Sequence, residues 1–119
     1  MGELFLVIVN GPPGAGKTTL GGRIAAQLGL PFISKDSVKD ILFDTLGWRD
    51  REWSKKLGRA SFEILFHFLE SQLEAGQPSV VETAFTPAFH TARFLGLREL
   101  YGFEPIQIYC RASDEVLFE

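Results

Sequence analysis

The first residues whose types and spacing suggest chemistry form a glycine-rich segment near the N-terminus. They match the pattern G-x-x-x-x-G-K-[ST] in full, as Gly11, Pro12, Pro13, Gly14, Ala15, Gly16, Lys17 and Thr18. Small residues let backbone N–H groups turn towards a phosphate chain, and a following helix adds the positive end of its dipole. We expect Lys17 to reach the β- and γ-phosphates, the Thr18 hydroxyl to ligate Mg²⁺ and Thr19 to contact the α-phosphate. The segment therefore predicts binding of a nucleoside triphosphate.

A second group of candidate residues follows the next predicted strand. Asp36, Lys39 and Phe43 are spaced at i, i+3 and i+7, so they share one face of a helix. They come after the carboxyl end of a strand, which is where open α/β sheets bind ligands. A carboxylate there can align a bound hydroxyl and accept its proton during phosphoryl transfer. The alternative is that Asp36 only adds favourable charge to a first helical turn.

Other polar and aromatic residues carry weaker signals. Arg23 and Arg93 fit solvated helix faces better than phosphate contacts, while a ligand contact and a structural role are equally open for Arg111. Trp48 and Trp53 flank a turn, and we interpret them as an anchor between helices rather than the wall of an acceptor pocket. His67 and His90, with the single cysteine, are too few to predict a metal cluster.

The elements that must position these residues alternate between strands and helices. The run 4–9 is continuously apolar, which is typical of a strand buried on both faces of a parallel sheet. Further strands are expected at 31–33, 78–82 and 106–110. Helices are expected from the glycine-rich turn to Gly29, from 34–37 onward, from a cap at Asp50 to Ala75, and from Thr86-Pro87 to Gly102. The inward positions of these helices are expected to be Leu20, Ile24, Ala25, Leu28, Val38, Ile41, Leu42, Thr45, Leu57, Ala60, Ile64, Leu65, Phe68, Leu73, Phe89, Ala92, Leu97 and Leu100. The alternation predicts an α/β fold with a parallel sheet.

Length and composition limit the remaining possibilities. The 119 residues, 45% of them hydrophobic, suit a single domain over 1–119 with a real core. A net charge of −3 disfavours a large nucleic-acid footprint. One cysteine, Cys110, excludes an internal disulfide, and the N-terminus has neither an export signal nor a run long enough to cross a membrane. We therefore expect a cytoplasmic protein with no membrane partner.

Four segments, in this order, resemble the predicted ATP-dependent kinases related to polynucleotide kinase, with chloramphenicol phosphotransferase and zeta toxins as more distant relatives. The segments are the glycine-rich loop, 33–39 (ISKDSVK), 80–85 (VVETAF) and 109–113 (YCRAS). The N-K-x-D base reader of switch GTPases is absent from the sequence. The resemblance implies a P-loop fold of the nucleoside-kinase type, with strand order 2-3-1-4, helices on both sides and the fifth strand missing.

The resemblance also implies roles for individual residues. Asp36 would be the general base for the acceptor hydroxyl, and Lys39, where relatives usually carry Arg, would hold the substrate. Glu82 would hold Mg²⁺ through a water molecule, unless it is only a solvated acid at a strand end, and Thr83 would assist it or only begin the turn. Kinases of this type carry a lid with arginines after the fourth strand, so we expect the domain to be incomplete at its C-terminus.

Two functions are left open by these observations. The first is an ATP- and Mg²⁺-dependent kinase that transfers the γ-phosphoryl group to a hydroxyl of a small molecule, with a nucleic-acid 5′ end as a less favoured acceptor. The second is a nucleotide-binding module without transfer activity, which has a regulatory or assembly role. A missing fifth strand would leave one sheet edge unpaired, and such an edge favours self-association.

Overall fold

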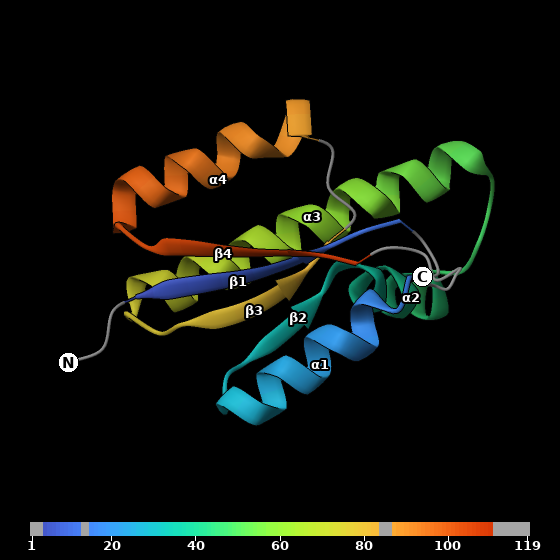
Figure 1. The fold of residues 1–119 in the computed structure, drawn as a ribbon. Helices are drawn as coiled ribbons and strands as arrows, with labels where there is room; N and C mark the ends of the chain where they lie inside the picture. Colours follow the sequence, from blue (N-terminus) through green and yellow to red (C-terminus); the bar gives the residue numbers. More distant parts are fainter. Residues whose placement is uncertain (1–3, 13–14, 84–86, 111–119) are drawn as a thin grey trace.

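The computed structural model describes residues 4–12, 15–83 and 87–110, and the side chains of residues 87–91 stand outside this description. Strands and helices alternate along the chain, except that two helices separate the second strand from the third (Figure 1). The described elements are β1 (Phe5–Asn10), α1 (Lys17–Leu28), β2 (Phe32–Ser34), α2 (Lys35–Leu46), α3 (Arg51–Glu74), β3 (Ser79–Glu82), α4 (Pro87–Tyr101) and β4 (Glu104–Tyr109). The α/β class predicted from the sequence is confirmed.

The four described strands form one parallel sheet in the order β2-β3-β1-β4, as predicted. In the register, Val7 of β1 lies between Val80 of β3 and Ile106 of β4. The outer strand β2 pairs with β3, and Ser34 at the end of β2 lies opposite Glu82 at the end of β3. Because all strands are parallel, their carboxyl ends meet at one edge of the sheet, and the polar residues that end β2 and β3 meet there too.

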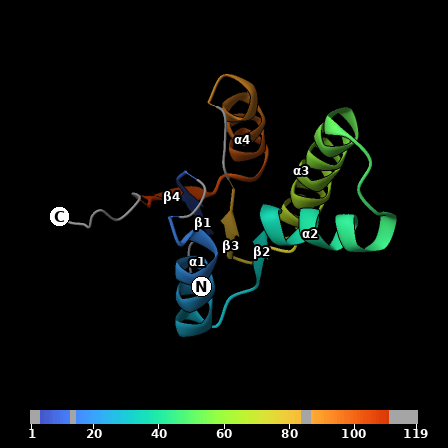
Figure 2. The same cartoon turned by 90° about the vertical axis from the view of Figure 1, so that its right-hand side faces the viewer.

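Helices cover the two faces of the sheet unequally (Figures 1 and 2). Helices α3 and α4 cover one face and α1 the other, while α2 packs mainly against α3. The core under α3 and α4 consists of Leu6, Ile8, Leu65, Phe66, Leu69, Leu73, Val81, Phe94 and Phe103. The core under α1 is smaller and consists of Val7, Val9, Ala25, Val80 and Cys110. The alternation along β1 sends even-numbered side chains to one core and odd-numbered ones to the other.

The ends of the helices follow their sequence signals. The Ser34 hydroxyl accepts a hydrogen bond from the Ser37 N–H and so caps α2, which begins within the predicted range 34–37. The Asp50 carboxylate accepts one from the Trp53 N–H and caps α3 as predicted. Gly29 ends α1 with φ 67°, a left-handed conformation that favours glycine. These caps fix where α2 and α3 begin, and hence which residues of α2 stand beside the end of β2.

Several predicted helix faces are wrong. Ile41 was expected to face inward but is 62% exposed, and α2 has no buried residue at all. On α4, Leu100 is 68% exposed, while Phe94 is buried in the core. The remaining inward predictions that the structure places on exposed surface are Leu28, Thr45, Ile64 and Ala92. In α2 the reason is its position beside the sheet rather than on it, so that it packs mainly on α3 and makes only small contacts with β2 and β3.

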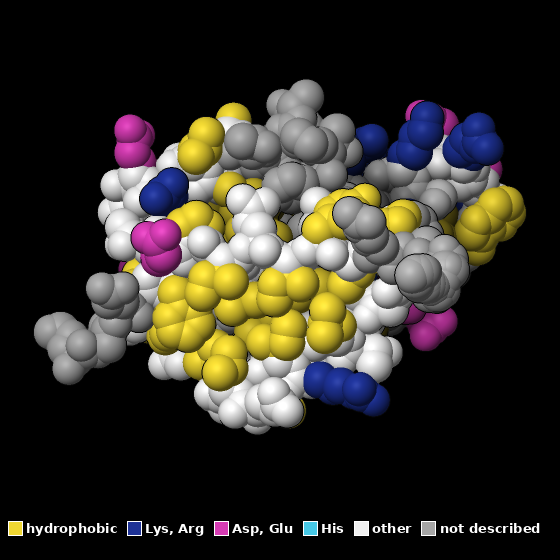
Figure 3. All heavy atoms as spheres, viewed as in Figure 1, with side chains coloured by type: hydrophobic (Ala, Val, Ile, Leu, Met, Phe, Trp, Pro, Cys, Tyr) yellow, Lys and Arg dark blue, Asp and Glu magenta, His cyan; other side chains and the backbone are white. Residues whose placement is uncertain are grey.

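The face of the sheet that carries α1 shows a band of hydrophobic side chains (Figure 3). Within the described ranges β4 pairs with β1 alone, so its other edge has no strand beside it. Ile106 and Tyr109 of β4 are 44% and 66% exposed. None of the described helices combines the length and the apolar character that crossing a membrane requires.

Candidate functional site

The glycine-rich loop connects the carboxyl end of β1 to the start of α1. The Asn10 carboxamide oxygen accepts a hydrogen bond of 2.8 Å from the Gly11 N–H, which fixes the start of the loop. Gly11 has φ 152°, and a Cβ there would lie 2.4 Å from the Cys110 carbonyl oxygen, so the position requires glycine. Gly16 precedes α1 with φ 81° and gives the helix no side-chain cap. The N-cap residue therefore supplies no side-chain acceptor to the first N–H groups of α1, and these groups suit an anion.

Lys17, the first residue of α1, is nearly buried, with 4% of its surface exposed. Its Nζ lies 3.5 Å from Oε2 of Glu82 at the end of β3. This Nζ makes no hydrogen bond within the described part of the chain. A buried ammonium with an ion pair but no hydrogen bond still has N–H donors available for a further anionic oxygen, and a phosphate supplies one.

Glu82 is fully buried and joins three elements of the fold. Its Oε1 accepts a hydrogen bond of 2.5 Å from the Ser34 hydroxyl and one of 3.2 Å from the Thr18 hydroxyl. Its Oε2 faces Lys17 and receives no hydrogen bond from the described residues. The structure thus brings together Lys17, Thr18 and Glu82, three residues that the sequence predicted for phosphate and metal binding.

The same place holds further unsatisfied polar atoms. Among the described residues, buried side-chain atoms without a hydrogen-bond partner are Lys17 Nζ, Glu82 Oε2 and the Thr83 hydroxyl oxygen. Buried polar groups are normally satisfied, so three of them beside one loop indicate that a polar ligand completes the site. An ammonium, a hydroxyl and a carboxylate are the groups that hold a nucleoside triphosphate and its Mg²⁺. These residues therefore fit ATP and Mg²⁺.

Ser34 is a site residue that the sequence reasoning missed. Its hydroxyl donates to Glu82 and accepts from the Ser37 N–H at 3.1 Å, so one side chain both orients the carboxylate and starts α2. The sequence predicted that a helix starts near Ser34, which is one part of its role. The sequence did not predict the other part, which is the parallel register that places Ser34 beside Glu82.

The predicted acceptor residues lie in the first turns of α2. Asp36 is exposed and Lys39 is half-buried. The neighbouring Lys35, which the sequence reasoning did not single out, is also half-buried. Burial lowers the pKa of Lys35 below its ordinary value, and the nearby charge of Lys39 lowers it further, against the opposing effect of Asp36 and Glu82. This part of α2 therefore carries an acid and two cations close to the phosphate loop.

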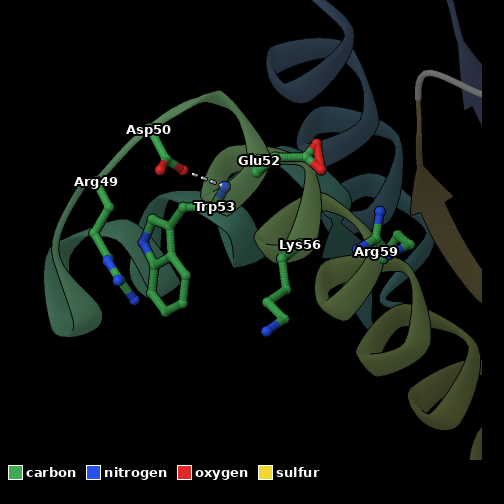
Figure 4. A pocket seen from close by; sticks show the side chains of 6 residues that line it. All are labelled: Arg49, Asp50, Glu52, Trp53, Lys56 and Arg59. Atoms are coloured by element: carbon green, nitrogen blue, oxygen red, sulfur yellow. Dashed lines mark hydrogen bonds between the residues drawn. The ribbon is translucent and has the colours of Figure 1, made fainter.

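A hollow of about 290 Å³ lies at the junction of α2 and α3 (Figure 4). It is lined by Arg49, Asp50, Glu52, Trp53, Lys56 and Arg59. The Arg49 guanidinium lies 5.0 Å from the Trp53 ring centroid, and the Trp53 indole N–H donates to the Gly47 carbonyl at 2.7 Å. Trp53 therefore ties the turn to α3, which supports our interpretation as an anchor, while Trp48 is 70% exposed.

The remaining candidates lie away from this constellation or outside the described residues. Arg93 forms an ion pair of 2.6 Å with Glu63 and stacks on Phe66 at 4.1 Å, so its contacts are structural. Arg23 and His67 are exposed on α1 and α3. The predictions for Pro13, Gly14, Arg111 and the side chain of His90 fall on residues that the structure does not describe.

Elsewhere in the described chain, the residues do not indicate a second metal site or a reactive cysteine. Its histidine, cysteine and acidic residues form no cluster of three that could hold a metal ion. Burial raises the pKa of the Cys110 thiol, whose residue contacts Gly11 through its backbone. A thiol with a raised pKa stays protonated near neutral pH, and it is a poor nucleophile.

Comparison with known proteins assigns the fold to kinases. Residues 6–119 match a family described as an AAA domain. A cytidylate kinase from Ignicoccus hospitalis is 43% identical over 44 residues, which cover 37% of this chain and 26% of that protein. A shikimate kinase from Paracidovorax citrulli is 31% identical over 119 residues, which cover 98% of this chain and 61% of that protein.

A solved structure from Chloroflexus aurantiacus, of a protein provisionally described as a kinase, is 42% identical with a TM-score of 0.87. The match covers 92% of this chain and 60% of that one. The chain thus spans about three fifths, or less, of the length of these relatives. The resemblance inferred from the sequence is confirmed, and the chain belongs to this family of AAA domains, with the parallel sheet of a P-loop kinase.

Proposed function

We propose that the chain is the nucleotide-binding part of an ATP- and Mg²⁺-dependent kinase that phosphorylates a hydroxyl group. The observation that carries this proposal is the buried pair of Lys17 and Glu82, with its unsatisfied polar atoms and with the hydrogen bond from the exposed Thr18, at the end of the glycine-rich loop. The kinases to which the chain is similar support the reaction class. Bound ATP with Mg²⁺ would supply the γ-phosphoryl group.

The chain's own residues would divide the work as follows. Lys17 binds the β- and γ-phosphate oxygens, and its positive charge offsets the charge that develops there. The Thr18 hydroxyl and Glu82, through a water molecule, hold Mg²⁺, with Ser34 keeping the carboxylate oriented. Asp36 aligns the acceptor hydroxyl and accepts its proton, while Lys39 holds the acceptor.

A calorimetric titration with Mg²⁺ and a non-hydrolysable ATP analogue tests the binding step. We expect saturable binding that is lost or strongly weakened in Lys17→Ala. Absence of binding by the folded wild-type chain would contradict the kinase and equally the alternative of a binding module without transfer.

A screen of ADP release tests the transfer step, with sugars, nucleosides, antibiotics and 5′-hydroxyl oligonucleotides as acceptors. We expect Asp36→Asn to lower acceptor-dependent turnover about 10²–10⁴-fold, the usual contribution of a general base. Asp40→Asn is the matched control, because Asp40 is exposed one turn further along α2. Equal turnover in both variants would exclude Asp36 as the base, and nucleotide binding without any turnover would favour the module.

Three more specific expectations, about the metal ion, the acceptor and self-association, are also predictions. They are the choice of Mg²⁺ over other divalent ions, a nucleic-acid 5′ end as acceptor, and self-association through the outer edge of β4. The exposed Ile106 and Tyr109 on that strand support self-association. Sedimentation analysis at several protein concentrations would test it.

A further inference from the structure

Two lysines of α2 converge on a single glycine of α3. A Cβ placed on Gly58 would lie 3.6 Å from the Nζ of Lys39 and 3.9 Å from the Nζ of Lys35. Gly58 is in the interior of α3, where alanine would form a more stable helix. Its missing side chain lets both ammonium groups approach the backbone of α3 at the same point.

This pair of cations has no carboxylate partner in the described chain. The ion pairs of the described residues, within 4.0 Å, involve Lys17, Lys55 and Arg93 but neither Lys35 nor Lys39. Each of the two contacts an aromatic ring instead, Lys35 that of Phe62 at 5.1 Å and Lys39 that of Phe43 at 5.6 Å. Two half-buried like charges at one place repel each other, and an anion between them would add to the opposing effect of Asp36 and Glu82.

The position of the pair relates it to the reaction. Lys35, Asp36 and Lys39 belong to the same two turns of α2, directly after the end of β2. The charges of Lys17 and Glu82 are close enough to act on Lys35, so the phosphate loop is near. An anionic group between the two ammonium groups would therefore lie on the part of α2 that carries Asp36, near the phosphate loop.

We propose that Lys35 and Lys39, above the bare backbone of Gly58, bind an anionic group of the acceptor, a carboxylate or a phosphate. The anion site stands on the geometry of α2 and α3, and its assignment to the acceptor rests on the proposed kinase function. Lys35 and Gly58 are then specificity determinants in addition to Lys39. Neutral hydroxyl compounds would be poor acceptors, because they leave both ammonium groups without a countercharge.

The direct test follows the side-chain NMR signals of labelled lysines. The full chain is first saturated with Mg²⁺ and a non-hydrolysable ATP analogue, so that the glycine-rich loop is filled, and then titrated with inorganic phosphate or malonate. We expect saturable shifts of the Lys35 and Lys39 signals, with dissociation constants in the millimolar range. Lys35→Met or Lys39→Met should weaken binding about tenfold, equivalent to ~1.4 kcal/mol.

Two further variants separate the proposal from a general loss of structure. Gly58→Asp supplies a carboxylate to the pair from within the chain, and it should abolish anion binding while the protein stays folded. Lys55→Met is the matched control, because Lys55 is exposed on α3 and pairs with Glu52 at 4.0 Å. Anion binding that is unaffected by Lys35→Met and by Gly58→Asp would overturn the proposal.

Kinetics then distinguish this inference from the proposed function. With anionic acceptors we expect Lys35→Met to raise KM about tenfold and leave the affinity for the ATP analogue unchanged. Anion binding without turnover would refute the kinase but not the anion site. Turnover of neutral acceptors with the same KM in all variants would refute the acceptor assignment, as would a weaker affinity for the ATP analogue in Lys35→Met.

Discussion

Removing either member of the buried ion pair of Lys17 and Glu82 should strongly destabilise the domain in the absence of nucleotide. We consider Lys17→Met, Glu82→Gln and the double variant. Both side chains are almost completely shielded from water, with exposed fractions of 4% and 0%. Methionine matches the length of the lysine stem and glutamine the shape of the carboxylate, so each single change mainly removes one charge and leaves its partner buried.

The expected magnitudes follow from that burial. Removing one member of a buried pair lowers the free energy of unfolding by about 3–5 kcal/mol, which is a large share of the ~5–15 kcal/mol of a typical domain. Removing both leaves no uncompensated charge, and the carboxamide oxygen introduced by Glu82→Gln can still accept the hydrogen bond from Ser34. We therefore expect the double variant to be more stable than the sum of the single changes predicts, by about 2–3 kcal/mol.

The free energies of unfolding of the wild type and all three variants can be measured by equilibrium urea unfolding, with far-ultraviolet circular dichroism as the signal. Unchanged m-values would show that the same surface is exposed on unfolding in every variant. Lys55→Met serves as the control, because its exposed ion pair with Glu52 should contribute about 1 kcal/mol or less. Single changes that add within ~0.5 kcal/mol in the double variant would refute an energetically coupled pair.

Two smaller predictions concern α1 and α2. Burial lowers the pKa of Lys35, so the unfolded chain binds more protons than the folded one between that lowered pKa and 10.5. The free energy of unfolding should therefore rise with pH in this window relative to Lys35→Met, and parallel pH curves would contradict the shift. On α1, Gly22→Ala should raise the free energy of unfolding by up to ~1 kcal/mol. Gly21→Ala should be clearly less stable than Gly22→Ala, because its Cβ would lie 2.6 Å from the Phe32 ring rather than 3.9 Å, and equal thermal unfolding temperatures would count against this packing.

The sequence predicted the sheet and the phosphate loop well, for a physical reason. A continuously apolar strand followed by a complete glycine-rich motif has few alternative structures, and Gly11 and Gly16 do adopt the positive φ values that the loop needs. The caps at Ser34 and Asp50 are local signals of the same kind. Such features depend on neighbours in the chain and on little else.

The inward faces of α2 and α4 could not be obtained in the same way. Both helices carry apolar residues on more than one face, so the pattern allows several rotations about the helix axis. Tertiary packing selects among them, and it buries Phe94 while leaving Ile41 and Leu100 exposed. The buried face of α4 carries Phe94, which forms a tilted aromatic pair with Phe66 of α3, with ring centroids 5.1 Å apart. The two members of this pair come from different helices.

The same distinction explains which site residues were found. Lys17, Thr18 and Glu82 were predicted because each stands in a motif or at the end of a strand. The role of Ser34 needs the register of β2 against β3, and the role of Gly58 needs the packing of α2 on α3. Neither relation can be read from residues that are adjacent in the sequence.

The two halves of the site differ in how their charges are balanced within the chain. At the phosphate loop the Lys17 ammonium has the Glu82 carboxylate, so folding brings an acid and a base together. Beside α3, Lys35 and Lys39 come together without a described carboxylate within ion-pair distance, and there folding works against the desolvation of Lys35 and the repulsion from Lys39, which Asp36 and Glu82 oppose. A fold retains such repulsion when a ligand relieves it, because the unfavourable term in the free protein becomes favourable in the complex. The pair of Lys35 and Lys39 is therefore the observation on which we base the proposal that the acceptor carries a negative charge of its own.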